Sequence, residues 1–131
     1  LHHKVMVERL LGAMGLFLWA KSENDMDAIT ALSGSGPAYL FYMIECMAKA
    51  GSDAGLDEDF AMNLARQTVI GSAALAEESS TTSVQTLRED VTSPNGTTAA
   101  GLFVLMNGEF EKIVRETIKR ATNRSKELSG T

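Results

Sequence analysis

Residues 37–48 limit what this chain can fold into more than any other part of the sequence. The segment carries one charge, at Glu45, and its spacing predicts a helix with apolar side chains all around. It is too short to cross a membrane, which requires about 20 apolar residues. A helix that is apolar all around must be covered on every side, and a second copy of the chain provides that cover most simply. The sequence therefore predicts a homo-oligomer, and a monomer with a central helix is the alternative.

The composition is typical of a globular, helical chain. Apolar residues make up 44% and charged residues 22% of the 131 residues, which excludes disorder and fibrous repeats. Met, Ala and Leu are frequent and alternating β-branched runs are few, so helices are favoured over sheet. We therefore expect an all-α helical bundle.

Net charge and cysteine content limit which partners the protein can bind and which cellular compartment it suits. The formal net charge of −5 argues against a general nucleic-acid-binding surface, and no segment has the length of a membrane span. The single cysteine, Cys46, cannot form an internal disulfide, and no signal peptide is recognisable. We expect a cytoplasmic protein that binds neither nucleic acid nor membrane.

The first 24 residues predict three short pieces. Residues 1–3, with paired histidines, are typical of an affinity-tag remnant, and no further ligands complete a metal site there. Residues 5–14 predict an amphipathic helix that ends near Gly15. Residues 16–20 are all apolar and suit a short buried strand, which the rest of the chain offers no partner. Such an orphan strand must pair elsewhere or join a helix.

Two segments of small polar residues, 33–37 and 92–98, stand directly before apolar helices. The first is expected to interrupt a helix that starts at Asp25, with Pro37 in the first turn of the next helix. Backbone N–H groups, hydroxyls and the positive end of a helix dipole together bind a carboxylate or phosphate. Each segment taken alone is more often an ordinary helix cap, but two in one chain favour an anion site.

The final third of the chain predicts further helices. Ser83 is a suitable cap for a short helix through Val91, and the last helix runs from Phe110 toward Lys126. Four apolar residues of this last helix are expected to face inward: Ile113, Val114, Ile118 and Ala121. Its many Lys and Arg residues predict a solvated face, and a contact with nucleotide phosphate is the less favoured alternative.

Several sharper motifs are absent from the sequence. The pair Gly34 and Gly36 is not a dinucleotide fingerprint, because Tyr39 occupies the third glycine place and a helix precedes it. No phosphate-binding loop that ends in Gly-Lys-Ser or Gly-Lys-Thr occurs, and a Ser-His-Asp triad would have to use the terminal histidines. The sequence therefore identifies no cofactor-binding residues.

Residues 31–39 (ALSGSGPAY) and 90–98 (DVTSPNGTT) closely resemble two segments of the pyrroline-5-carboxylate reductases, and the second matches that family's signature region. The similarity extends from Val7 to Leu128. The resemblance implies the C-terminal half of an NAD(P)H-dependent enzyme that reduces 1-pyrroline-5-carboxylate to L-proline. NADPH or NADH would be bound mainly by a Rossmann domain that precedes this chain, so the fragment alone is expected to be inactive.

The resemblance also implies a division of the chain. Residues 1–3 would be the tag remnant, residues 4–24 the tail of the nucleotide-binding domain, and residues 25–131 the helical dimerisation domain. In that family the helices of two copies interlock, which implies a dimer or a ring of dimers with each active site near the subunit interface.

By the same resemblance, the loop at residues 93–98 holds the substrate carboxylate through backbone N–H groups. Thr98 is the implied catalytic residue, because its hydroxyl would lie beside the imine nitrogen and assist the arrival of hydride at the imine carbon. The implied substrate-binding residues are Ser35, Gly36, Pro37, Ser93, Asn95, Gly96, Thr97 and Thr98. The family usually has Gly-Gly where this chain has Asn95-Gly96, and Asn is the non-glycine residue best suited to positive φ. The alternative is a non-catalytic oligomerisation module whose loops are only helix caps.

Overall fold

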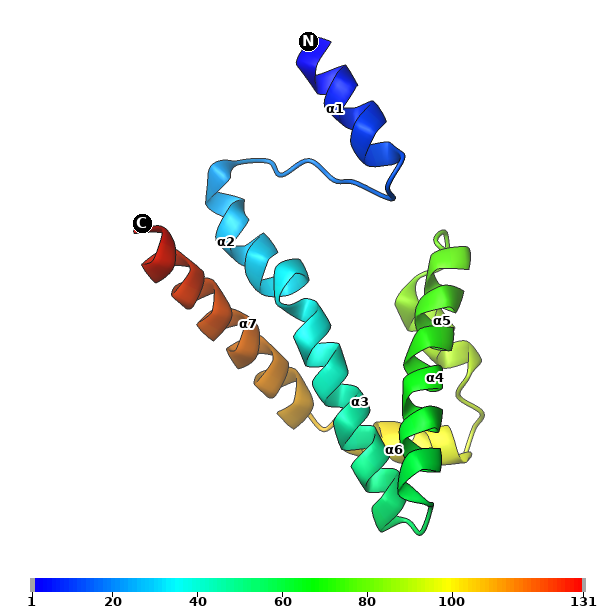
Figure 1. The fold of residues 1–131 in the computed structure, drawn as a ribbon. Helices are drawn as coiled ribbons and strands as arrows, with labels where there is room; N and C mark the ends of the chain where they lie inside the picture. Colours follow the sequence, from blue (N-terminus) through cyan, green and yellow to red (C-terminus); the bar gives the residue numbers. More distant parts are fainter. Residues whose placement is uncertain (1, 131) are drawn as a thin grey trace.

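The computed structural model describes residues 2–130, which form helices joined by loops and contain no β-strand (Figure 1). The predicted all-α class is confirmed. Leu1 and Thr131 lie outside the described residues, so the predicted tag remnant at residues 1–3 is covered only in part.

The first helix, α1 (His2–Gly12), is followed by a segment without regular secondary structure. The strand considered for residues 16–20 does not form, because residues 2–130 contain no second strand with which it could pair. Trp19 instead folds back onto α1. Its Nε1 donates a hydrogen bond to the Glu8 carboxylate at 2.9 Å, and the Lys4 ammonium lies 4.9 Å from the centre of its ring.

Four helical pieces then follow one another as a single long rod (Figure 1): η1 (Glu23–Asp25), α2 (Met26–Ile29), the π-helical turn η2 (Thr30–Gly34) and α3 (Gly36–Asp53). The expected break at residues 33–36 is wrong, because the helix widens there instead of ending. Pro37 has no N–H for the Ser33 carbonyl four residues earlier, so the ordinary helical bond is lost. The Ser35 N–H donates to the Thr30 carbonyl at 2.9 Å, five residues back, and continues the rod. Pro37 lies in the first turn of α3, as predicted.

The rod turns sharply into the next helix, α4 (Glu58–Glu78). The chain leaves α3 through Gly55, whose φ of 100° is left-handed backbone that suits glycine. Asp57 then caps α4, because its carboxylate accepts a hydrogen bond from the Phe60 N–H at 3.1 Å. The two helices lie side by side in opposite directions (Figure 1).

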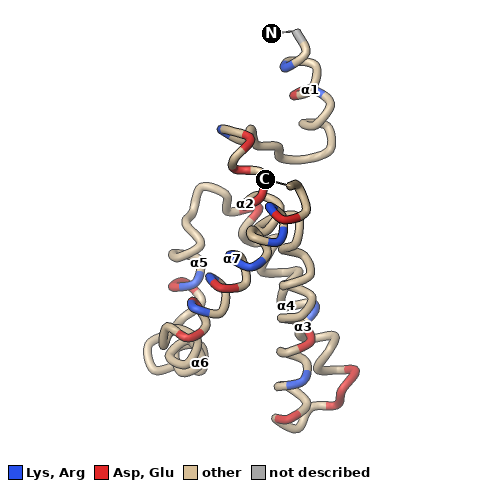
Figure 2. The backbone as a smooth tube through the Cα atoms, turned by 90° about the vertical axis from the view of Figure 1, so that its left-hand side faces the viewer, with Lys and Arg blue, Asp and Glu red and all other residues tan. Residues whose placement is uncertain are grey.

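Three further helices complete the chain: α5 (Val84–Asp90), α6 (Thr97–Leu105) and α7 (Glu109–Ser129). Ser83 caps α5 as predicted, since its hydroxyl accepts a hydrogen bond from the Thr86 N–H at 3.1 Å. The C-terminal part of α7 packs on α2 and η2, where the Ser125 hydroxyl donates to the Asp27 carboxylate at 2.6 Å and Ala31 is fully buried. Figure 2 shows acidic and basic residues interspersed along α7, and exposed ion pairs such as Arg120–Glu116 join them.

A single copy buries very little apolar surface. Within residues 2–130 the buried apolar residues are all alanines: Ala31, Ala48, Ala61 and Ala65. The exposed area is 10,893 Å², whereas a compact monomer of 14.1 kDa exposes about 6,700 Å². Large apolar side chains therefore lie open on most helices.

Two predictions about burial are affected by this open surface. The apolar helix at residues 37–48 is not covered within one copy, and Phe41 and Tyr42 are 64% and 67% exposed. On α7, Ile118 and Ala121 are half-buried as predicted, but Ile113 and Val114 are exposed, so the prediction that they face inward is wrong for a single copy. The sequence pattern marks an apolar face correctly, yet this chain alone supplies nothing to cover it. No helix within residues 2–130 is long and apolar enough to cross a membrane.

Candidate functional site

The loop between α5 and α6 is a tight turn over residues 93–96. The Gly96 N–H donates to the Ser93 carbonyl at 3.1 Å, and Pro94 follows Ser93 at the first inner position of the turn. Asn95, at the second inner position, has a φ of 59°. Pro followed by a residue with positive φ is the pattern of a type II turn. Asn95 thus adopts the positive φ that the sequence analysis expected an Asn at this position to accept.

Gly96 is required by a close approach within this turn. A Cβ atom at this position would lie 2.3 Å from the Ser93 hydroxyl oxygen and 3.2 Å from the Ser93 carbonyl oxygen. The backbone of Gly96 itself is extended, with φ −81° and ψ 173°, so the requirement comes from space rather than from its dihedral angles. A larger residue would require the Ser93 side chain to rotate away and the Ser93 carbonyl to shift slightly.

The start of α6 presents backbone N–H groups that the protein does not use. Gly96 is the N-cap and has no side chain to accept from them, and the first N–H bonded within the helix is that of Ala100, to the Gly96 carbonyl at 3.1 Å. The N–H groups of Thr97, Thr98 and Ala99 thus have no acceptor within residues 2–130. They lie at the positive end of the helix dipole, an arrangement that suits a carboxylate or a phosphate. The Thr97 and Thr98 side chains are exposed in the same turn of helix.

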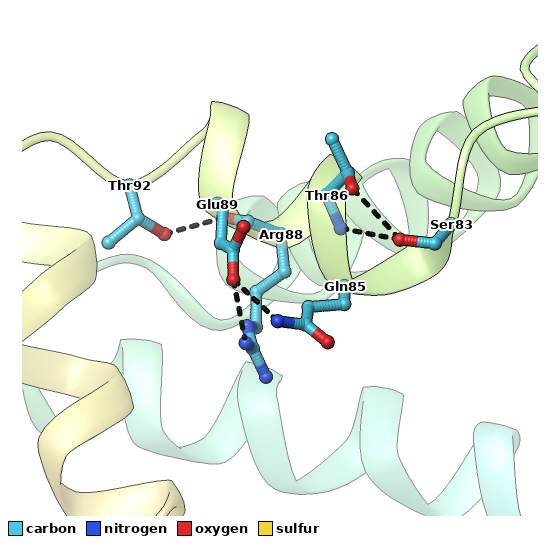
Figure 3. A network of polar contacts seen from close by, with 6 residues as sticks. All are labelled: Ser83, Gln85, Thr86, Arg88, Glu89 and Thr92. Carbon is cyan, nitrogen blue, oxygen red and sulfur yellow. Dashed lines mark hydrogen bonds and ion pairs between the residues drawn. The ribbon is translucent and has the colours of Figure 1, made fainter.

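A polar network on α5 holds the other end of the loop (Figure 3). The Thr92 hydroxyl donates to the Arg88 carbonyl at 2.6 Å, and the Glu89 carboxylate accepts from Gln85 at 2.8 Å. The Arg88 guanidinium lies 3.7 Å from the same carboxylate oxygen. The sequence analysis included Thr92 in the segment 92–98 but assigned it no role of its own, and it did not single out Gln85, Arg88 or Glu89. The signal that could have found Thr92 is a hydroxyl residue two positions beyond a helix end, where two backbone carbonyls need donors.

A groove of about 510 Å³ lies between this network and α6. Arg88 and Thr92 line one side, and Leu102, Phe103 and Met106 are among the apolar residues on the other. Phe103 is 83% exposed in a single copy, so the groove is open and largely apolar. It adjoins the loop through Thr92.

The segment at residues 33–37 lies inside the rod, at the η2–α3 junction, and not in a separate loop. The Ser35 N–H donates to the Thr30 carbonyl at 2.9 Å, and the Ala38 N–H donates to the Ser35 carbonyl at 3.1 Å. The Ser33 hydroxyl donates to the Ile29 carbonyl at 2.9 Å. Within residues 2–130 no hydrogen bond or ion pair joins this segment to the loop at 93–98. The predicted residues Ser35, Gly36 and Pro37 lie at the η2–α3 junction.

The loop at residues 93–98 contains no titratable side chain, because its side chains are hydroxyls, an amide and a proline. The two clear pKa shifts lie on other helices. A hydrogen bond with Cys46 raises the pKa of Tyr42 on α3, and a hydrogen bond from Arg120 lowers the pKa of Glu116 on α7. No group of three His, Cys, Asp or Glu residues in the described part of the chain is placed to hold a metal ion. The candidate site therefore works through backbone N–H groups and hydroxyls.

The fold and the loop together define a class of protein, namely an all-α association module that carries a turn with open N–H groups. A family described as "Pyrroline-5-carboxylate reductase dimerisation" matches residues 23–128. The chain therefore belongs to the pyrroline-5-carboxylate reductase family and contains its dimerisation domain, as the two sequence motifs suggested.

Individual relatives agree with this assignment. The chain is 42% identical over 126 residues to pyrroline-5-carboxylate reductase 1 of Bacillus subtilis, covering 96% of this chain and 42% of that protein. It is 44% identical over 124 residues to pyrroline-5-carboxylate reductase of Pisum sativum, covering 95% of this chain and 45% of the relative. The chain thus spans less than half the length of these relatives.

Solved structures show the same fold. A pyrroline-5-carboxylate reductase from Coxiella burnetii superposes with a TM-score of 0.90 at 41% identity, over 97% of this chain and 47% of the other. A pyrroline carboxylate reductase from Plasmodium falciparum, solved with NADP bound, gives a TM-score of 0.80 at 35% identity, over 95% of this chain and 47% of the other.

Proposed function

We propose that this chain is the dimerisation and substrate-carboxylate-binding half of an NAD(P)H-dependent reductase that converts 1-pyrroline-5-carboxylate to L-proline. The observation that carries the proposal is the turn at residues 93–96, which leaves three N–H groups open at the start of α6 beside the Thr98 hydroxyl. The names of the relatives support the reaction and its place in proline biosynthesis.

In this proposal the loop fixes one end of the substrate and Thr98 fixes the other. The N–H groups of Thr97, Thr98 and Ala99 hold the carboxylate, and the Thr98 hydroxyl donates to the imine nitrogen. Holding the ring at both points orients its C=N bond, and such orientation contributes several kcal/mol, on the order of 10²-fold or more in rate. Thr98 is the proposed catalytic residue. The proposed substrate-binding residues are Ser35, Gly36, Pro37, Ser93, Asn95, Gly96, Thr97 and Thr98.

Residues 2–130 contain no strand, so they form no βαβ unit of the kind that binds NAD or NADP. The proposal therefore assigns NADPH or NADH, which supplies the hydride, to a domain before this chain, with residues 4–24 as its tail. Residues 25–131 form the dimerisation domain, and the chain alone is expected to be inactive.

The proposed partner is a second copy of the chain, in a homodimer or a larger homo-oligomer. The exposed area of 10,893 Å² and the open face with Phe41, Tyr42, Ile113 and Val114 support this. Light scattering is expected to give at least twice the mass of 14.1 kDa. A monomer at micromolar concentration would contradict the proposal.

The net charge of −5 and the lone Cys46 support a cytoplasmic setting without nucleic acid or membrane as partners.

The deciding experiment uses the parent protein, in which this chain follows its natural upstream domain. Oxidation of NADPH or NADH is measured on addition of 1-pyrroline-5-carboxylate, and turnover with formation of L-proline is the expected result. A folded parent that binds cofactor and forms oligomers but does not turn over would favour the alternative, a non-catalytic oligomerisation module.

A further inference from the structure

Thr92 ends α5 with two hydrogen bonds from one residue. In a continuing α-helix the Thr92 N–H would donate to the carbonyl of Arg88, four residues earlier. Here the Thr92 N–H instead donates to the Glu89 carbonyl at 2.9 Å. The Thr92 hydroxyl donates to the Arg88 carbonyl at 2.6 Å. Both carbonyls belong to the last turn of α5, where intrahelical donors run out. The single side chain therefore satisfies an otherwise open carbonyl while the backbone leaves the helix.

The turn that follows begins at the next residue. Ser93 supplies the carbonyl that accepts from the Gly96 N–H at 3.1 Å, and Gly96 is the N-cap of α6. Ser93 directly follows Thr92, so a change in where the chain leaves α5 moves the Ser93 carbonyl and, through this hydrogen bond, the Gly96 cap of α6. The path of the chain at Thr92 therefore affects the position of the open N–H groups, which begin five residues later at Thr97.

We propose that Thr92 is a positioning residue, whose hydroxyl bond to Arg88 sets the turn that binds the substrate carboxylate. This inference rests on the proposed function of the loop. Thr92 is half-buried and lines the groove against α6, so its side chain is held between α5 and α6. The side-chain pair formed by Gln85 and Glu89 steadies the same helical turn (Figure 3).

The test compares three variants of the full-length parent. Thr92→Val keeps the shape of the side chain and removes the hydroxyl, whereas Thr92→Ser keeps the hydroxyl. Thr86→Val is the matched control, because Thr86 lies on the same helix and its hydroxyl pairs with Ser83 at the opposite end. The measured quantities are KM and kcat for 1-pyrroline-5-carboxylate.

Thr92→Val is expected to raise KM on the order of tenfold, because the loss of one hydrogen bond misplaces the groups that hold the carboxylate. Its kcat is expected to stay within about twofold, since Thr98 is intact and the bound fraction reacts normally. Thr92→Ser is expected to restore KM to within about threefold of wild type, and Thr86→Val to leave it unchanged. An unchanged KM in Thr92→Val, a failure of serine to restore it, or an equal rise in Thr86→Val would overturn the inference.

Amide hydrogen exchange of the same variants separates this inference from the proposed function. The Gly96 N–H is expected to exchange on the order of tenfold faster in Thr92→Val than in wild type or Thr92→Ser. A parent that does not reduce 1-pyrroline-5-carboxylate would refute the proposed function, and the exchange result would then decide alone whether Thr92 positions the turn. Equal exchange in all variants would refute the positioning role.

Discussion

The segments at residues 33–37 and 93–97 both contain serine, glycine and proline but fold in different ways. The first consists of these three residue types alone, and the second also contains Asn95 and Thr97. In the first, the N–H groups of Ser35 and Ala38 are bonded within the rod formed by α2, η2 and α3. In the second, the chain makes a separate turn and the first N–H groups of α6 have no acceptor within residues 2–130.

The position of proline accounts for the difference. Pro37 comes last in its segment, inside the first turn of α3, so its missing N–H only widens the helix into a π-helical turn. Pro94 comes second in its segment and is followed by Asn95 at positive φ, which reverses the chain. In this chain the segment that turns is the one that leaves the N–H groups of Thr97, Thr98 and Ala99 without an acceptor within residues 2–130.

The largest effect is expected from removing the Thr98 hydroxyl, at the start of α6. Thr98→Ala in the parent protein is expected to lower kcat on the order of 100-fold, because the imine nitrogen loses its hydrogen-bond donor. The oligomer is expected to stay intact, since the substitution removes only one hydroxyl and one methyl group. Steady-state kinetics and light scattering measure the two effects.

Ser33→Ala is the matched control for that substitution. It removes only the bond to the Ile29 carbonyl within the rod, so kcat is expected to change less than about twofold. Equal losses in both variants would show that the two segments do not differ in function.

A second test adds one methyl group to each segment. Gly96→Ala is expected to raise KM for 1-pyrroline-5-carboxylate about tenfold, because its Cβ would lie 2.3 Å from the Ser93 hydroxyl oxygen, so that the Ser93 side chain and carbonyl must shift. Gly34→Ala meets only the Thr30 methyl group, at 3.8 Å, and is expected to stabilise the helix by about 0.5 kcal/mol. Kinetics and denaturant unfolding of the two variants provide the measurements. A normal KM in Gly96→Ala would contradict the requirement for a close approach.

The smallest expected effect concerns the backbone of the turn. Asn95→Val is expected to destabilise the protein by about 1 to 2 kcal/mol, because a β-branched residue does not adopt a φ of 59° without strain. Asn95→Gly is expected to change stability by less than about 0.5 kcal/mol, since glycine accepts this conformation freely. Denaturant unfolding of both variants distinguishes them, and equal stabilities would argue against a left-handed residue at this position.

Local signals in the sequence predict much of this fold. The cap at Ser83, Pro37 in the first turn of α3 and the all-α class follow from residue types that act over a few positions. The π-helical turn does not follow from them, because Gly and Ser next to Pro suit either a break or a widened helix. The exposure of Ile113 and Val114 could not be predicted from the sequence either. An apolar face has the same sequence pattern whether its own chain or another copy covers it.

The candidate site also has a part that could be predicted from the sequence and a part that could not. The turn at residues 93–96 and the role of Asn95 within it follow from the motif, because proline and positive φ strongly restrict the backbone. The anchor at Thr92 was not predicted, since its function depends on which carbonyls are left open at the end of α5. The roles of Ser35, Gly36 and Pro37 stay predictions, as one copy does not bring them to the loop.

The large exposed area of the single chain bears on how the protein reaches its final state. A copy that leaves 10,893 Å² in contact with water, with many large apolar side chains in that area, favours association with another copy. Refolding from denaturant is therefore expected to be second order in protein, and the midpoint of thermal unfolding to rise as the protein is concentrated. Dilution should then lower the stability of the folded protein. The concentration of the chain in a cell would therefore help to determine the fraction that is folded.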